Sequence, residues 1–167
     1  WLEDLGMNDL TLLSHQLSQQ LLAKDWKLCT AESCTGGLIA GTCTDLPGSS
    51  LWFERGFVTY SNAAKTEMLG VPASLIADHG AVSEPVALAM TSGAIAHAQA
   101  QVAVAVTGVA GPGGGTAAKP VGTVWLAWSI GGQLSAERCH FEGDRAQVRQ
   151  ATVRYAMQGL ISRLSQI

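Results

Sequence analysis

Charged residues are scarce in this chain of 167 residues, in which Asp, Glu, Lys and Arg together make up 14%. The 13 acidic residues outnumber the 10 basic ones, so the formal net charge is −3 and there is no excess of positive charge for binding nucleic acid. No apolar run is long enough to cross a membrane, and the first ten residues lack the basic and apolar regions of a signal peptide. These absences argue against a nucleic-acid-binding protein and against a membrane protein.

Metal-binding and disulfide patterns are missing as well. The four cysteines include no C-x-x-C pair, and three of them lie within or beside apolar runs; they are Cys29, Cys34, Cys43 and Cys139. The four histidines are scattered, without the spacing of a zinc site. We therefore expect no metal ion, and we expect the cysteines to be small buried hydrophobic residues in a reducing cytoplasm.

Hydrophobic residues make up 47% of the chain, enough to fill the core of one domain over residues 1–167. Leucine spacing and capping residues predict helices over 8–24, 62–69, 72–79 and 83–100. Two more helices are expected, one that begins at Gly36-Gly37 and ends before Pro47 and one that begins after Asp144. Apolar and aromatic runs predict strands over 26–32, 51–60 and 101–111, and a hairpin over 121–141 that turns at Gly131-Gly132. This order predicts an α/β fold, a three-layer α/β/α sandwich with a mixed, mostly parallel sheet.

The segment "TAESCTGG", residues 30–37, follows the first predicted strand and opens a helix. Ser33 is the best-placed nucleophile because it lies at the strand exit, just ahead of the glycines. The helix start offers main-chain N–H groups of Cys34, Thr35 and Gly36 as donors of an oxyanion hole. Cys34 is a competing nucleophile, since a helix N-terminus lowers the pKa of a thiol.

The segment "YSNAAK", residues 60–65, brings a tyrosine and a lysine to the next strand-to-helix junction. A lone lysine is by default a solvated helix residue. In a desolvated pocket, however, the pKa of Lys65 would fall, and its amine would serve as a base toward a serine hydroxyl.

The segment "TGVAGPGGG", residues 107–115, is the plainest binding signal, because glycines leave main-chain N–H groups open to an anion. It lacks the spacing of a P-loop or of G-x-G-x-x-G, and the alternative is a bare flexible loop. Arg145 and Arg149 follow, four residues apart on one helix face. They suit a clamp for phosphate or carboxylate, although spacing alone favours an ordinary solvated face.

All three segments follow predicted strand ends. Ligands in open α/β sheets bind beyond the carboxyl ends of strands. We therefore expect residues 32–37, 60–65 and 107–116 to meet in one pocket.

Taken together and in this order, "TAESCTGG", "YSNAAK", "AVSEP", "VTGVAGPGGG", "KPVGTVW" and "GDR" closely resemble the C-terminal domain family of competence/damage-inducible protein A, CinA. The resemblance runs from about residue 10 to the end of the chain. Stand-alone members of that family are nicotinamide-nucleotide amidases, and we expect this chain to be of that kind. The resemblance implies hydrolysis of the carboxamide of nicotinamide mononucleotide in pyridine-nucleotide salvage, by a cytoplasmic enzyme that needs no metal or other cofactor and is usually a dimer.

Matched to the family motifs, the catalytic residues are Ser33 as nucleophile, Lys65 as general base and Tyr60, which we expect to align the pair. The substrate-binding residues expected from the motifs are Thr107, Gly108, Gly111, Gly113, Gly114 and Arg145. We expect the partner to be a small nucleotide, with no nucleic acid or membrane involved, and the assembly to be a homodimer. Two alternatives remain at this stage: a nucleotide-binding regulatory module without catalysis, and a thiol enzyme that uses Cys34.

Overall fold

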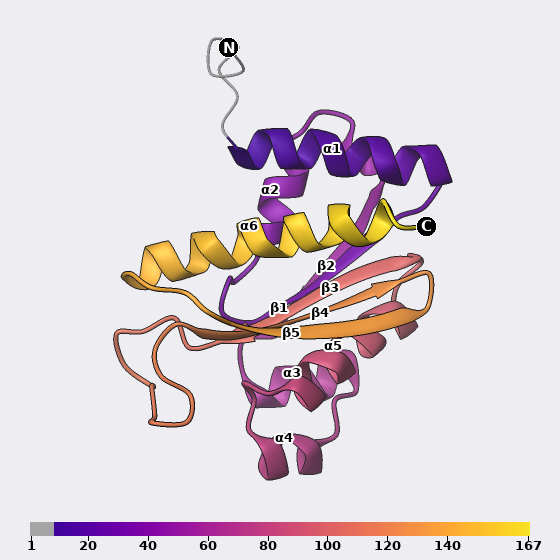
Figure 1. Ribbon diagram of the computed structural model, residues 1–167. Coiled ribbons are helices and arrows are strands. Elements are labelled where there is room, and N and C mark those ends of the chain that lie inside the picture. The colour runs from indigo at the N-terminus through magenta and orange to yellow at the C-terminus, as the bar shows by residue number, and fades with distance from the viewer. Residues whose placement is uncertain (1–8) are drawn as a thin grey trace.

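A computed structural model describes residues 9–167 (Figure 1). The helices are α1 (Asp9–Lys24), α2 (Leu38–Thr44), α3 (Asn62–Leu69), α4 (Ala73–His79), α5 (Glu84–Ala96) and α6 (Arg145–Leu164), with a short 3₁₀ helix η2 (Ser49–Leu51). The strands are β1 (Leu28–Glu32), β2 (Phe53–Val58), β3 (Val102–Gly108), β4 (Thr123–Ile130) and β5 (Gln133–His140). In this part of the chain, no helix is both long and apolar enough to cross a membrane.

The five strands form one sheet in the order β2-β1-β3-β4-β5. β1 pairs in parallel with both β2 and β3, whereas β4 is antiparallel to β3 and to β5. Only β4 therefore runs against the other strands, and the prediction of a mixed, mostly parallel sheet is confirmed. The carboxyl ends of β1, β2 and β3 consequently meet at one edge of the sheet.

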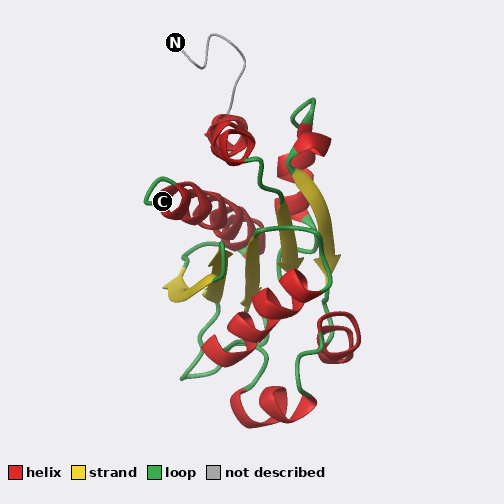
Figure 2. Cartoon of the chain, turned by 90° about the vertical axis from the view of Figure 1, so that its right-hand side faces the viewer, coloured by secondary structure: helices red, strands yellow, loops and turns green. Residues whose placement is uncertain are grey.

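Helices cover both faces of the sheet, which confirms the predicted three layers (Figures 1 and 2). Side chains of β3 alternate between the two layers: Val104 and its neighbours at even positions join the core under α1, α2 and α6. Ala103 and Ala105 face the second core, with Met90 of α5 and Leu69 of α3. The run "VAVAV" thus supplies bulky side chains to one face and small ones to the other, as a strand buried on both sides requires.

Local signals in the sequence correctly predict several helix ends and the hairpin. Ser61 caps α3 by accepting a hydrogen bond from the Ala64 N–H at 3.0 Å. Asp144 and Gln147 form a reciprocal capping box at the start of α6. The hairpin turns at Gly131-Gly132, where both residues have positive φ, the geometry of a two-residue turn.

Some predicted boundaries are wrong by a few residues, and the first predicted helical residue, 8, lies outside the described residues. α5 ends at Ala96 instead of near residue 100, because the chain turns to enter β3, where the N–H groups of Gln101 and Val102 donate to Lys27 O. The strand predicted over 51–60 is shorter, since residues 49–51 form the 3₁₀ turn and β2 ends at Val58. β3 likewise ends at Gly108, so residues 109–111 belong to the following loop.

Candidate active site

The side chains of Ser33 and Lys65 meet at the carboxyl edge of the sheet. Ser33 directly follows β1, and Lys65 lies in the first turn of α3, which follows β2. Lys65 Nζ is 3.1 Å from Ser33 Oγ and donates to Thr59 O at 3.0 Å. The structure therefore brings together the two residues in which the sequence suggested a nucleophile and its base.

Burial governs the charge of Lys65. Its side chain is 1% exposed, and within residues 9–167 it forms no salt bridge. Burial lowers the pKa of Lys65 because an ammonium ion loses hydration there, while the neighbouring Cys34 acts in the opposite direction. These conditions favour the neutral amine that a general base requires.

The nucleophile loop, residues 33–37, is held in place by main-chain hydrogen bonds. The Ser33 N–H donates to Val106 O of β3 at 3.1 Å, and the Gly36 N–H donates back to Ser33 O at 3.0 Å. Gly36 and Gly37 have φ of 57° and 105°, a left-handed conformation that favours glycine. The glycine pair thus allows the chain to turn sharply from β1 into α2 directly behind Ser33.

Glu32, the last residue of β1, is a buried support of this loop that sequence reasoning missed. It is 1% exposed, and its Oε1 accepts hydrogen bonds from the Thr35 hydroxyl at 2.6 Å and from the Ile39 N–H at 2.8 Å. Its Oε2 accepts from the Ala40 N–H at 3.0 Å. A carboxylate bound by N–H groups at a helix start is stabilised there, so Glu32 fixes α2 against β1. A charged residue at the end of an otherwise apolar strand was the available signal.

Arg149 is also placed differently from the expectation of a paired clamp. Its Nε donates to Cys34 O at 3.1 Å, and its Nη2 donates to Thr35 O at 3.2 Å. It therefore binds the back of the nucleophile loop, while Arg145, one turn earlier on α6, lies at the pocket.

Arg145 connects two of the predicted segments. Its Nη1 donates to Gly111 O at 2.8 Å, and its Nη2 donates to the hydroxyl of Tyr60 at 2.9 Å. Tyr60 thus contacts Arg145, and among the described residues no hydrogen bond joins its hydroxyl to Ser33 or Lys65. The hydrogen bonds give no support to the expected alignment of the pair by Tyr60.

A pocket of about 330 Å³ opens above the Ser33–Lys65 pair, a size typical of small-molecule sites. Its lining includes Ser33, Cys34, Tyr60, Lys65, Thr107, Gly108, Gly111, Gly113, Gly114 and Arg145. The expected convergence of three segments is therefore confirmed. Thr35 and Gly36 are not among the lining residues, and the Gly36 N–H is already used by Ser33 O. Asn62, at the start of α3, also lines the pocket and was not predicted from the sequence.

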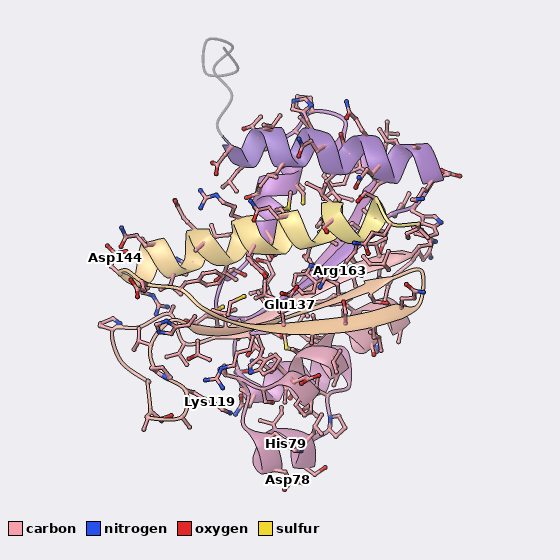
Figure 3. All side chains as sticks on the ribbon, in the orientation of Figure 1. Asp78, His79, Lys119, Glu137, Asp144 and Arg163 are labelled. Carbon is pink, nitrogen blue, oxygen red and sulfur yellow. The ribbon has the colours of Figure 1, made fainter. Side chains whose placement is uncertain are left out.

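The threonine and the glycine-rich loop form the opposite wall. The Thr107 hydroxyl, 1% exposed at the end of β3, donates to Ala81 O at 2.9 Å. The loop between β3 and β4 is fastened at its far end by Lys119, whose Nζ donates to His79 O at 2.8 Å (Figure 3). The loop is thus tied to α4 and, through Arg145, to α6, so it is not a bare loop.

Cys34 is unsuited to the role of nucleophile. Its side chain is 5% exposed and belongs to the core, and burial raises the pKa of its thiol to about 12. A thiol protonated at neutral pH is a poor nucleophile, so the helix N-terminus does not activate it here.

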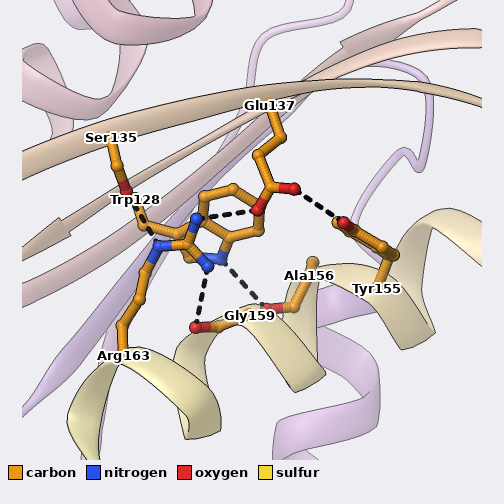
Figure 4. A network of polar contacts seen from close by, with 7 residues as sticks. All are labelled: Trp128, Ser135, Glu137, Tyr155, Ala156, Gly159 and Arg163. Carbon is orange, nitrogen blue, oxygen red and sulfur yellow. Dashed lines mark hydrogen bonds and ion pairs between the residues drawn. The ribbon is translucent and has the colours of Figure 1, made fainter. Parts of the chain in front are cut away.

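A larger hollow of about 570 Å³ lies between β5 and the end of α6. Its cation, Arg163, is already engaged by Ser135 Oγ, Gly159 O and Glu137 Oε2, and it stacks on the Trp128 ring (Figure 4). This network joins α6 to the sheet and leaves the charge paired. The smaller pocket, which holds Ser33 and Lys65 as candidate nucleophile and base, is therefore the candidate active site.

Residues 10–164 of this chain match the family model of the CinA C-terminal domain. The chain belongs to the CinA C-terminal domain family. The match covers every strand of the sheet and every residue of the pocket described above.

Two curated relatives are similar over nearly their whole length. Nicotinamide-nucleotide amidohydrolase PncC of Pseudomonas putida is 54% identical over 155 residues, which cover 93% of this chain and 97% of the relative. The protein of the same name from Escherichia coli strain K12 is 51% identical over 155 residues, covering 92% and 93%.

Solved structures of the family share the fold. A crystal structure of a CinA superfamily protein from Klebsiella pneumoniae superposes with a TM-score of 0.92 at 38% sequence identity, covering 96% of this chain and all of that one. The arrangement of sheet and helices is thus that of the CinA superfamily.

Proposed function

We propose that this protein is a nicotinamide-nucleotide amidase, which hydrolyses the carboxamide of nicotinamide mononucleotide to nicotinate mononucleotide and ammonia. The observation that carries the proposal is the contact of 3.1 Å between Ser33 Oγ and the buried Lys65 Nζ. The name of the two relatives above supports the choice of substrate. A buried amine beside a serine hydroxyl is the arrangement used by serine–lysine hydrolases.

In the first half of the reaction, Ser33 forms an acyl-enzyme. Neutral Lys65 keeps one N–H on Thr59 O, and its lone pair accepts the proton of the Ser33 hydroxyl. Ser33 Oγ attacks the carboxamide carbon, and the carbonyl oxygen becomes an oxyanion. Lys65 then gives its proton to the amide nitrogen, the C–N bond breaks and ammonia leaves.

In the second half, water releases the acid. Lys65 removes a proton from the water, which attacks the acyl carbon, and the bond to Ser33 Oγ breaks as Lys65 returns the proton to serine. Main-chain N–H groups of the nucleophile loop stabilise both oxyanions. Cys34 and Thr35 are the better donors, because the Gly36 N–H is engaged with Ser33 O.

The rest of the pocket suits the nucleotide. Arg145 and the glycines at positions 111, 113 and 114 offer a positive charge and open main-chain N–H groups for the phosphate. Tyr60 holds the guanidinium of Arg145, and its own O–H is left to donate to the substrate. We expect Thr107 to lie near the ribose or the reacting group, where its oxygen can accept a hydrogen bond.

Two further properties follow from the family resemblance and belong to the same proposal. We place the enzyme in pyridine-nucleotide salvage in the cytoplasm, and we expect it to be a homodimer. Light scattering of the purified protein would measure its mass, and a monomer at micromolar concentration would contradict the dimer.

The thiol alternative makes a different prediction. An enzyme that used Cys34 would be inactivated by iodoacetamide, whereas the pKa of about 12 predicts that the thiol stays unreactive. Rapid inactivation that substrate prevents would favour the thiol enzyme.

The test of the proposed function is ammonia release from nicotinamide mononucleotide, beside nicotinamide and glutamine, in the presence of EDTA. Wild-type protein should act on the nucleotide alone, and Lys65→Ala should lose that activity. Equal turnover of free nicotinamide would contradict the requirement for the phosphoribosyl group. Saturable binding of the nucleotide without turnover would favour the regulatory module instead.

A further inference from the structure

The nucleophile loop has two main-chain N–H groups that the described part of the fold does not use, although of the two residues only Cys34 lines the pocket. Among the described residues, the N–H groups of Cys34 and Thr35 donate no hydrogen bond to another residue, whereas those of Ser33 and Gly36 are both engaged. Cys34 also lines the pocket beside Ser33. The pair of free donors therefore follows the nucleophile directly along the chain.

The carbonyl groups of the first three residues of the same loop all accept hydrogen bonds. Ser33 O accepts the Gly36 N–H, Cys34 O accepts Arg149 Nε, and Thr35 O accepts both Arg149 Nη2 and the Leu38 N–H. A trans peptide group is planar, and its C=O and N–H point in opposite directions. Holding Cys34 O against α6 therefore directs the Thr35 N–H away from α6 and fixes the main chain of Cys34 between two anchored carbonyls.

Arg149 is well suited to this task. It is half-buried on α6, and its planar fork reaches two successive carbonyls that a single ammonium group would not hold in the same geometry. A charged donor on a carbonyl also polarises the N–H of the same peptide group, which strengthens that donor. On the sheet side, Glu32 fixes the Thr35 side chain and the start of α2.

From these contacts we infer that Arg149 is a positioning residue of the reaction: by holding Cys34 O it directs the Thr35 N–H, and by holding Cys34 O and Thr35 O it fixes the main chain that follows Ser33, so that the N–H groups of Cys34 and Thr35 form the oxyanion hole. This inference rests on the proposed amidase function. Arg149 reaches the substrate only through the main chain, so its loss weakens the transition state more than the bound substrate.

Steady-state kinetics with nicotinamide mononucleotide test the inference in Arg149→Met and Arg149→Lys. We expect kcat to fall about 10- to 100-fold in Arg149→Met, with KM changed less than about threefold, because an oxyanion donor acts in the transition state. Arg149→Lys should lose less, since one ammonium group binds only one carbonyl well. Arg154→Met, an exposed arginine on the same helix that pairs with Asp9, is the matched control and should keep wild-type kcat.

Chemical rescue separates positioning from general support of the fold. In Arg149→Ala, guanidinium ion at a concentration that does not unfold the protein should restore part of kcat, and sodium chloride at equal ionic strength should not. Thermal unfolding of each variant shows whether it is folded. If Arg149→Met does not fold, the kinetics of Arg149→Lys provide the test.

Three results would overturn the inference. An unchanged kcat in folded Arg149 variants means that the loop needs no such anchor. A raised KM with unchanged kcat means that Arg149 binds substrate instead. If the wild-type protein does not hydrolyse the amide, the proposed function fails and the inference fails with it. This outcome is recognised from the wild-type enzyme alone, so it is distinct from the two results above.

Discussion

The buried amine of Lys65 contacts one hydroxyl oxygen and one carbonyl oxygen in place of bulk water. With 1% of the side chain exposed and Ser33 Oγ and Thr59 O as its partners, a positive charge there is poorly solvated. An ordinary lysine is protonated at neutral pH and cannot accept a proton. In the proposed mechanism, burial is therefore what allows Lys65 to act as a base.

The pH dependence of kcat/KM tests the state of Lys65. A lowered pKa means that the amine loses its proton at a lower pH, so activity should rise with pH through an inflection below the ordinary lysine value of 10.5. The measurement is ammonia release over roughly pH 5 to 10. Lys65→Arg, which keeps the charge but cannot act as a base, should be inactive throughout. Activity that falls as pH rises over the same range would contradict a neutral lysine base.

The meeting of Ser33 and Lys65 could be predicted from the sequence, whereas the roles of Glu32 and Arg149 could not. Ser33 and Lys65 lie at successive strand ends, so topology alone brought them together. Glu32 and Arg149 bind N–H and C=O groups of the nucleophile loop, and no residue type marks such partners in a sequence. Arg149 lies 114 residues from Thr35 along the chain, and only the packing of α6 against α2 and β3 brings the two together.

The start of α6 is the element on which the pocket depends most. Asp144 accepts the Gln147 N–H at 2.9 Å, and the Gln147 side chain accepts the Asp144 N–H at 2.8 Å. Arg145 follows at once and reaches Gly111 and Tyr60. The cap thus sets the position from which Arg145 enters the pocket.

Replacement of the cap residue measures its contribution. Asp144→Ala should lower the free energy of unfolding by about 1 kcal/mol, because a helix-start N–H loses its partner. Asp144→Asn, whose side-chain oxygen can accept the same hydrogen bond, should retain most of the stability. Urea unfolding of the two variants gives the comparison, and equal losses in both would mean that charge rather than the hydrogen bond matters.

The ends of helices and strands could be predicted where they depend on residues close together in the sequence. The caps at Ser61 and Asp144 and the turn at Gly131-Gly132 depend on residues a few positions apart. The end of α5 does not, because the residues after Ala96 are good helix formers, yet the chain must turn there so that Gln101 can bond Lys27 O. Tertiary pairing overrides helix propensity at that point.

At the scale of the whole molecule, close packing of the α6 layer on the sheet brings distant segments to one edge. Gly159 of α6 lies against the Trp128 ring of β4, where an added Cβ would come within 2.3 Å of Cζ2. The Trp128 Nε1–H donates to Ala156 O at 3.2 Å, which fixes the indole beneath the helix. This contact sets how near α6, and with it Arg145 and Arg149, lies to the strands.

Two glycine-to-alanine variants in helices separate packing from helix propensity. Gly159→Ala should destabilise the protein by about 1 to 3 kcal/mol, since the methyl group forces α6 and Trp128 apart. Gly41→Ala in α2, where no atom beyond the neighbouring residues and the backbone of the same helix lies within 4 Å of the added Cβ, should stabilise it by up to about 1 kcal/mol. Denaturant unfolding measures both, and a stabilised Gly159→Ala variant would contradict the tight contact.

The central claim is that Ser33 is the nucleophile of an amidase, and the most direct test is the kcat of Ser33→Ala with nicotinamide mononucleotide. We expect Ser33→Ala to keep less than about one per cent of wild-type turnover while retaining the thermal stability of the wild type. Ser162→Ala, an exposed serine of α6, serves as the control and should be fully active. A folded Ser33→Ala variant that keeps more than a few per cent of the wild-type kcat would contradict the account.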